Sequence, residues 1–315
     1  AMVCKKLQAL LPLHASGLSW RIKRLIPNAE CDSITINGVS QCMKRWGSTP
    51  GLELYLSTEY CDFGIDVEQT SQIESYASEQ SLYSHLTKLN LGIDFALGRG
   101  FVTSLVVLDI QMYLNPANII MAINSSSGTL ECFKYTGLQN VEELTPSDVL
   151  NIGLALKNCS RLKSFKLEEV TVMYRTSITK TSQRLARYGA TLTQITPMLL
   201  DACPNLTTIA LCECELTDAD IQTLVAAFAK ASRPLEFTCF TSEVTWKIMC
   251  GALHHFKTCS GFDCKTEAEL RHLMEAVKQA PQLKGLIGWI NVEIHEELRS
   301  EFYRTCSDLG IELYV

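Results

Sequence analysis

Apolar side chains recur along the chain in a short frame that is apolar at its first, fourth and sixth positions. The clearest copy is Leu206, Ile209 and Leu211, which continues to Cys214 and Leu216 and reads L-x-x-L-x-L-x-x-C-x-L. Alternation of this kind is typical of a short strand with one buried face. The other copies are Leu86-Leu89-Leu91, Leu105-Leu108-Ile110, Leu130-Phe133-Tyr135, Leu162-Phe165-Leu167, Cys259-Phe262-Cys264, Leu283-Leu286-Gly288 and a terminal Ile311-Leu313 with its frame starting at Asp308.

The spacing of these frames is that of a repeat protein. From 206 the next frame starts after 28 or 29 residues, and the following steps are 24, 24 and 25 residues, whereas the upstream steps are 19, 25, 32 and 44. Strand-plus-helix repeats of roughly 20–29 residues are a known class of solenoid, and the longer steps require inserted helix or loop. One strand has two possible registers: starting it at 234 or 235 exchanges the facing of Phe237 and Phe240.

Helical patterns lie between the frames. The sequence predicts helices at 145–158, 181–202, 221–230, 270–277 and 292–305. Thr217 to Asp220 gives a start signal, and Thr266 with Glu269 has the spacing of a capping box. Prolines follow three of the helices and precede strands, where they end a helix without breaking a ladder.

This strand–helix alternation resembles the leucine-rich-repeat family, and most closely its ribonuclease-inhibitor-like branch. The resemblance implies an α/β solenoid shaped like a horseshoe, with parallel strands on the concave side and helices on the convex side. It covers residues 86–315 as one continuous domain, and residues 1–85 are expected to form an N-terminal cap with irregular repeats: strands at 31–36 and 51–56 and a helix at 71–82. The family's asparagine at the ninth position is mostly absent, which affects the curvature expected.

A solenoid of this kind would place its working surface on the strand residues between the inward positions. Trp289 and Tyr314 fall on such positions in neighbouring repeats, with Phe237 or Phe240 two repeats away. Exposed aromatic residues ringed by mixed charges are typical of protein interfaces. The candidate partner-binding residues are Lys134, Lys166, Glu168, Thr208, Cys212, Asp263, Lys265, Trp289, Glu312 and Tyr314.

Composition and charge limit the partners and the compartment that we expect for this chain. The net charge is -6, so no basic surface for nucleic acid is expected. No apolar run approaches the ~20 residues that span a bilayer. The apolar stretch near the N-terminus is interrupted by Pro12 and His14, unlike an export signal. The 14 cysteines lie partly within strand-like runs, so we expect buried thiols in a reducing, cytoplasmic compartment.

Signatures of catalysis or metal binding are weak. Cys212 and Cys214 could be combined with His254, His255 and Cys259 into a zinc site, but the repeat frame explains the C-x-C spacing and places the two cysteines on opposite faces. A Cys–His hydrolase lacks a family signature around its cysteines, and no phosphate-binding loop occurs. We therefore expect no enzyme activity, no cofactor and no metal.

Two functional hypotheses remain. The first is a non-catalytic scaffold that binds another protein on its concave face and is monomeric when unbound. The resemblance also implies a more specific function, in which the scaffold inhibits an enzyme by covering its active site. The degenerate, cysteine-rich repeats are also similar to leucine-rich-repeat effector proteins of intracellular bacterial pathogens, which implies a host cytosol. The alternative is an adaptor or GTPase-activating repeat protein acting on a bound protein; for a GTPase activator, Arg99 is the candidate arginine near the N-terminal edge.

Overall fold

The computed structural model describes residues 104–110, 115–136, 144–168, 189–212, 214, 216–239 and 247–314 with their side chains. It also describes the backbone of residues 21–22, 52–57, 86–92, 178–188 and 246. Within these residues no helix combines the length and the apolar character needed to cross a membrane.

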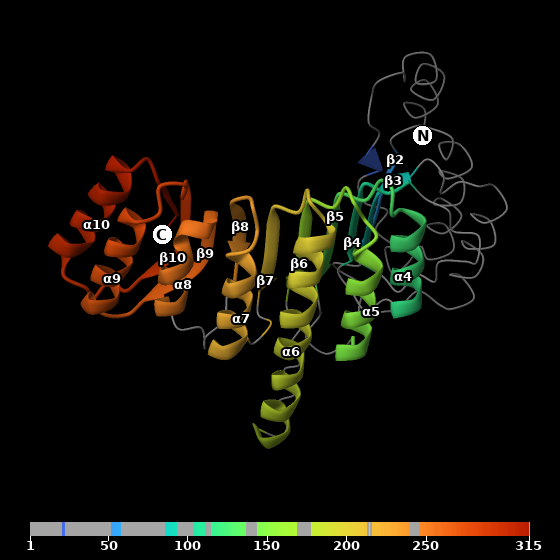
Figure 1. The fold of residues 1–315 in the computed structure, drawn as a ribbon, viewed down its shortest axis with the longest axis horizontal. Coiled ribbons are helices and arrows are strands. Elements are labelled where there is room, and N and C mark those ends of the chain that lie inside the picture. Colours follow the sequence, from blue (N-terminus) through green and yellow to red (C-terminus); the bar gives the residue numbers. More distant parts are fainter. Residues whose placement is uncertain are drawn as a thin grey trace, which may run out of the picture.

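The strands form one open parallel sheet in which every strand pairs with the strands before and after it along the chain (Figure 1). Such an order leaves each repeat in contact only with its neighbours. The strands are β1 (Arg21–Ile22), β2 (Leu52–Ser57), β3 (Leu86–Gly92), β4 (Val107–Ile110), β5 (Cys132–Thr136), β6 (Ser164–Glu168), β7 (Thr208–Cys212), β8 (Leu235–Thr238), β9 (Phe256–Cys264), β10 (Gly285–Ile290) and β11 (Glu312–Tyr314).

The described helices lie side by side in a single layer along one face of this sheet (Figure 1). Two of them, α4 and α8, were not assigned from the sequence. The bounds are α4 (Pro116–Ser125), α5 (Pro146–Leu156), α6 (Ile178–Ala202), α7 (Asp218–Phe228), α8 (Trp246–Ala252) with the short 3-10 turn η3 (Leu253–His255), α9 (Glu267–Lys278) and α10 (Glu296–Asp308).

The predicted α/β repeat architecture is therefore confirmed at the level of parallel strands alternating with helices. The strand expected at 51–56 corresponds to β2, whereas the strand expected at 31–36 and the helix at 71–82 lie outside the described residues. Strand β2 pairs with β3 in parallel, with one register shift after Leu52, so the sheet continues across residue 85. The division into a cap and a repeat region stays a prediction.

Capping explains where three of the helices begin. Thr145, Thr217 and Thr266 each accept a hydrogen bond from a backbone N–H three residues later, and the acidic residue there accepts one from the threonine N–H. Both exchanges satisfy donors that the first turn of a helix leaves unpaired. The start signals read at Thr217 and Thr266 are thus confirmed.

The core lies between the sheet and the helix layer. Inward strand residues such as Phe133 and Phe165 are buried and stack with ring centroids 6.2 Å apart. Farther along, Phe228 of α7 packs on Phe237 and Phe256, with centroids at 4.9 and 5.6 Å. Burial of these large side chains is the main stabilising contribution of each repeat.

The predicted frame is confirmed from β3 to β7. Leu108 pairs with Leu89 and Phe133, and Ile110 with Leu91 and Tyr135, so fourth and sixth positions meet on adjacent strands. The same pairing continues through β6 and β7.

In β8 the structure agrees with the frame that starts at 234, whereas the frames of β9 and β11 differ from those predicted. Phe237 is 1% exposed and opposes Cys259, so it belongs to the core and cannot contribute to a surface; Phe240 lies outside the described residues. In β9 the fourth position is Cys259, because it opposes Leu286 and the frame starts at Phe256. In β11 Leu313 opposes Leu286, which moves the frame two residues later than predicted from Asp308.

The frame of β9 starts three residues earlier than predicted, yet a bulge in the strand leaves its last side chains on the predicted sides of the sheet. Gly261 has φ of 100°, a conformation that glycine adopts without steric cost, and the pairing register with β10 shifts beside it. The extra residue returns Phe262 and Cys264 to the core side. Asp263 therefore faces outward, as the original frame had predicted.

Candidate functional site

The sheet face opposite the helices is the candidate site, and we call it the open face. Its side chains come from alternate strand positions and are half-buried to exposed, apart from small ones such as Ala210. From β4 to β11 the open face comprises Val107, Asp109, Cys132, Lys134, Thr136, Ser164, Lys166, Glu168, Thr208, Ala210, Cys212, Glu236, Thr238, Thr258, Ser260, Asp263, Gly285, Ile287, Trp289, Glu312 and Tyr314.

Five of the ten predicted residues gather in a central group on β5 to β7. Lys134 opposes Lys166, and Glu168 opposes Cys212, while Thr208 lies at the start of β7. Lys134 Nζ is 2.6 Å from a carboxylate oxygen of Glu168. Partial burial alone would lower the pKa of Lys134, but the hydrogen bond and charge of Glu168, with the charge of Asp109, outweigh it and raise that pKa.

The hydroxyl of Thr208 links this group to a strand that the sequence did not implicate. It donates to Glu236 of β8 at 3.0 Å, and Lys257 of β9 lies 3.3 Å from the same carboxylate. Glu236 was missed because its strand had two possible registers. Only the pairing of β8 with β7 fixes which side chains face outward.

The other five predicted residues gather at the C-terminal end of the described sheet, on β9 to β11 and at Lys265 directly after β9. Trp289 is 70% exposed and opposes Asp263, which forms an ion pair with Lys265 at 3.4 Å. Tyr314 is 57% exposed, and its hydroxyl donates to Glu312 at 2.9 Å, which raises the pKa of the phenol.

The aromatic side chains of this C-terminal group are close neighbours. Tyr314 opposes Ile287 on β10, and Trp289 lies two residues farther along that strand on the same face. Diagonal neighbours on adjacent strands are within reach of aromatic side chains. We call Trp289 and Tyr314 the aromatic pair. The structure therefore divides the ten residues into a central charged group and a C-terminal group, separated by β8.

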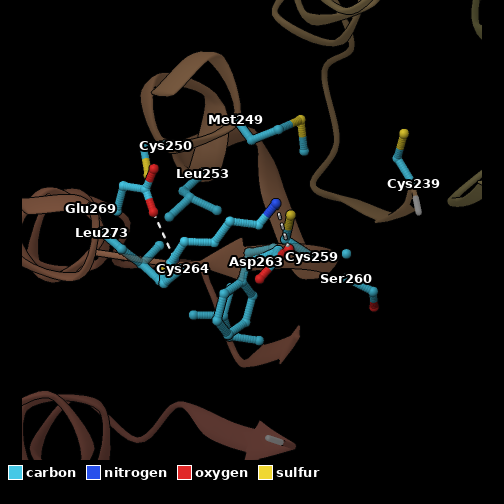
Figure 2. Close-up of a pocket in the computed structure, with 14 residues that line it drawn as sticks. Cys239, Met249, Cys250, Leu253, Cys259, Ser260, Asp263, Cys264, Glu269 and Leu273 are labelled. Atoms are coloured by element: carbon cyan, nitrogen blue, oxygen red, sulfur yellow. Dashed lines mark hydrogen bonds and ion pairs between the residues drawn. The ribbon is translucent and has the colours of Figure 1, made fainter. Parts of the chain in front are cut away.

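A cavity of about 110 Å³ lies where β9 meets helices α8 and α9. Figure 2 shows Met249, Cys250 and Leu253 on one side of it, with Cys259, Ser260, Asp263 and Cys264 along the strand. Burial raises the pKa of Cys259 and Cys264 to about 12 and also raises that of Cys250. Thiols with such pKa values stay protonated at neutral pH and are poor nucleophiles and metal ligands.

The zinc site considered from the sequence is not assembled in the described part of the chain. Cys214 is 2% exposed and its Sγ lies 3.6 Å from the carbonyl oxygen of Leu167, whereas Cys212 faces the other side of the sheet, as the frame predicted. Burial and the neighbouring His254 lower the pKa of His255. Among the described residues, no three His, Cys, Asp or Glu side chains gather in a way that could hold a metal ion.

Comparison with known proteins adds little to this geometry. No protein-family model matches the chain, and no curated protein does. Among solved structures the chain is similar to a protein from Bacteroides fragilis, with a TM-score of 0.38 and 12% sequence identity over 77% of this chain. The match spans 60% of that protein. A likeness at this level indicates neither a family nor an activity.

Proposed function

We propose that the chain is a non-catalytic scaffold that binds another protein on its open face, as the concave side of a leucine-rich-repeat horseshoe does. The observation that carries this proposal is the aromatic pair, two residues that are 70% and 57% exposed on a face that no described helix covers. Tryptophan and tyrosine dominate the binding energy of protein interfaces, because each buries a large rigid surface when a partner docks.

The surroundings of the aromatic pair support a protein partner. Asp263, Lys265 and Glu312 supply charges of both signs around it, and the central group adds Lys134 and Glu168. A polar rim around a few aromatic anchors is the usual anatomy of an interface. Within this proposal, docking over the active site of an enzyme would inhibit it, which is the finer function that the family resemblance implies.

The buried thiols support a reducing compartment. Eight described cysteines, among them Cys159, Cys203 and Cys306, are buried and form no disulfide. Burial raises the pKa of Cys159 to about 12 and that of Cys203 to about 11. A cytoplasm, including a host cytosol if the chain is a bacterial effector, keeps such thiols reduced.

The test is capture of partners from the native cell on the folded chain and on two variants. A Trp289→Ala/Tyr314→Ala double variant is expected to lose the partner, with a 10- to 1000-fold weaker affinity, about 1–4 kcal/mol. The matched control is Tyr303→Ala, since Tyr303 is a 40% exposed aromatic residue on helix α10. Full retention of every partner by the folded double variant would reject the proposed docking surface.

A further inference from the structure

Strand β11 is the last of the described strands and lies at one end of the sheet order. Among the described residues β11 pairs with β10 alone, and the N–H of Glu312 donates to the carbonyl of Lys284 at 2.9 Å. In a parallel sheet, every second residue of a strand directs both its N–H and its C=O to the same neighbouring strand, and the residues between direct theirs to the opposite side. The N–H and C=O of Leu313 therefore point away from β10 and can pair with another strand.

The aromatic pair lies beside this edge. Tyr314 is on β11 itself and Trp289 is on the adjacent β10, both on the open face. A strand added next to β11 would place every second side chain on that same face. Those side chains would then lie against the tyrosine and within reach of the tryptophan.

Acidic side chains are concentrated in the same final repeat. Residues 285–314 hold six acidic residues and two arginines, a net charge of -4 out of -6 for the whole chain. All six acidic side chains are exposed, and none forms an ion pair with another described residue. They are Glu293, Glu296, Glu297, Glu301, Asp308 and Glu312.

This charge decides between two occupants of the edge. A second copy of the chain, paired edge to edge, would bring two clusters of charge -4 together, and these exposed like charges repel each other most at low salt. A lysine- or arginine-rich segment would instead meet opposite charge, and its cations could stack on the exposed indole and phenol rings.

We propose that β11 and the aromatic pair bind an extended, basic peptide segment of a partner protein, which continues the sheet as an added strand. The inference rests on the proposed scaffold function and names the chemistry of its partner. Main-chain hydrogen bonds to Leu313 give affinity in this mode of recognition, and the alternating side chains give specificity.

The test uses three labelled ten-residue peptides with the full chain, followed by fluorescence anisotropy. A Lys–Val alternating peptide is expected to bind and to weaken at least tenfold between 50 mM and 500 mM salt, because surface charges are screened. A Glu–Val peptide is expected not to bind. A Lys–Pro peptide has the same charge but lacks half of the N–H donors, and it is expected to bind at least tenfold more weakly.

Variants at exposed positions test the site without disturbing the core. Trp289→Ala/Tyr314→Ala and Glu312→Lys should each weaken the Lys–Val peptide at least tenfold. The matched control, Glu275→Lys on α9, makes the same charge change outside the last repeat and should leave binding within twofold.

Each other outcome overturns a distinct claim. Equal binding of the Lys–Pro and Lys–Val peptides would exclude strand addition. Dimers in sedimentation experiments that dissociate in the double variant would show that the edge binds a second copy. If cellular partners need the aromatic pair but the Lys–Val peptide does not bind, the docking surface stands and the basic partner is wrong. If the folded double variant keeps every cellular partner and the Lys–Val peptide does not bind, both proposals are wrong.

Discussion

Gly288 on β10 is the residue on which the packing of the last repeats depends. It opposes Phe262, the residue that follows the bulge in β9, and faces the core. A Cβ atom at this position would lie 2.2 Å from the carbonyl oxygen of Phe262 and 2.5 Å from its ring. The nearest atom belongs to the backbone, so it cannot rotate away as a side chain would.

Gly288→Ala is therefore expected to destabilise the fold. Forcing a methyl group into a packed core costs about 1–3 kcal/mol, and more where the backbone must move. Urea denaturation followed by circular dichroism measures the loss. Gly251→Ala is the control: nothing lies within 4 Å of its added Cβ on helix α8, so the free energy of unfolding should rise by up to about 1 kcal/mol. Equal stability of Gly288→Ala and the parent chain would contradict the close approach.

At the scale of elements, how much the sequence predicts depends on whether a strand follows the frame without interruption. The facing of β5, β6 and β7 follows from apolar first, fourth and sixth positions alone. The segment at 235–240 contains Phe237 and Phe240, and from the sequence alone either of them suits the core. Strand β9 gains one residue at Gly261, and the Ser260-Gly261 pair was its only signal in the sequence.

The same limit applies to the site. Alternation predicted which side chains point outward, including both members of the aromatic pair. It could not predict which residues meet, since neighbours on different strands are set by hydrogen-bonding register. The link from Thr208 through Glu236 to Lys257 is therefore visible only in the structure.

The capping box of α7 offers a test at this scale. In Thr217→Ala the N–H of Asp220 loses its acceptor at 3.3 Å, and the free energy of unfolding should fall by about 1 kcal/mol. Thr223→Ala removes the same atoms from an exposed position within the helix and should change it by a few tenths of a kcal/mol. Thermal or urea unfolding distinguishes the two; similar losses would mean that the cap contributes nothing specific.

At the scale of the whole molecule, the buried thiols couple stability to alkaline pH. Burial raises the pKa of Cys159, Cys259, Cys264 and Cys306 from 9.0 to about 12. Above about pH 9 the unfolded chain releases these protons while the folded chain keeps them. The unfolded state then binds fewer protons, so the free energy of unfolding falls as pH rises.

The expected slope is measurable by urea denaturation between pH 7 and 10.5. Well below pH 9 each thiol adds nothing to this slope. Between its unfolded-state and folded-state pKa values its contribution to the slope approaches about 1.4 kcal/mol per pH unit. Cys159→Ala should make the slope shallower, whereas Val149→Ala, another buried truncation in the same repeat, should lower stability without changing the slope. Identical slopes in the two variants would show that Cys159 does not titrate as described.

The strictly sequential order of the sheet also determines how such a molecule can vary in length. Because each strand is bonded only to its predecessor and successor, deleting or duplicating one complete strand–helix unit alters a single junction and leaves the remaining interfaces as they were. Gene variants that differ by whole units can therefore share one architecture while carrying docking surfaces of different extent.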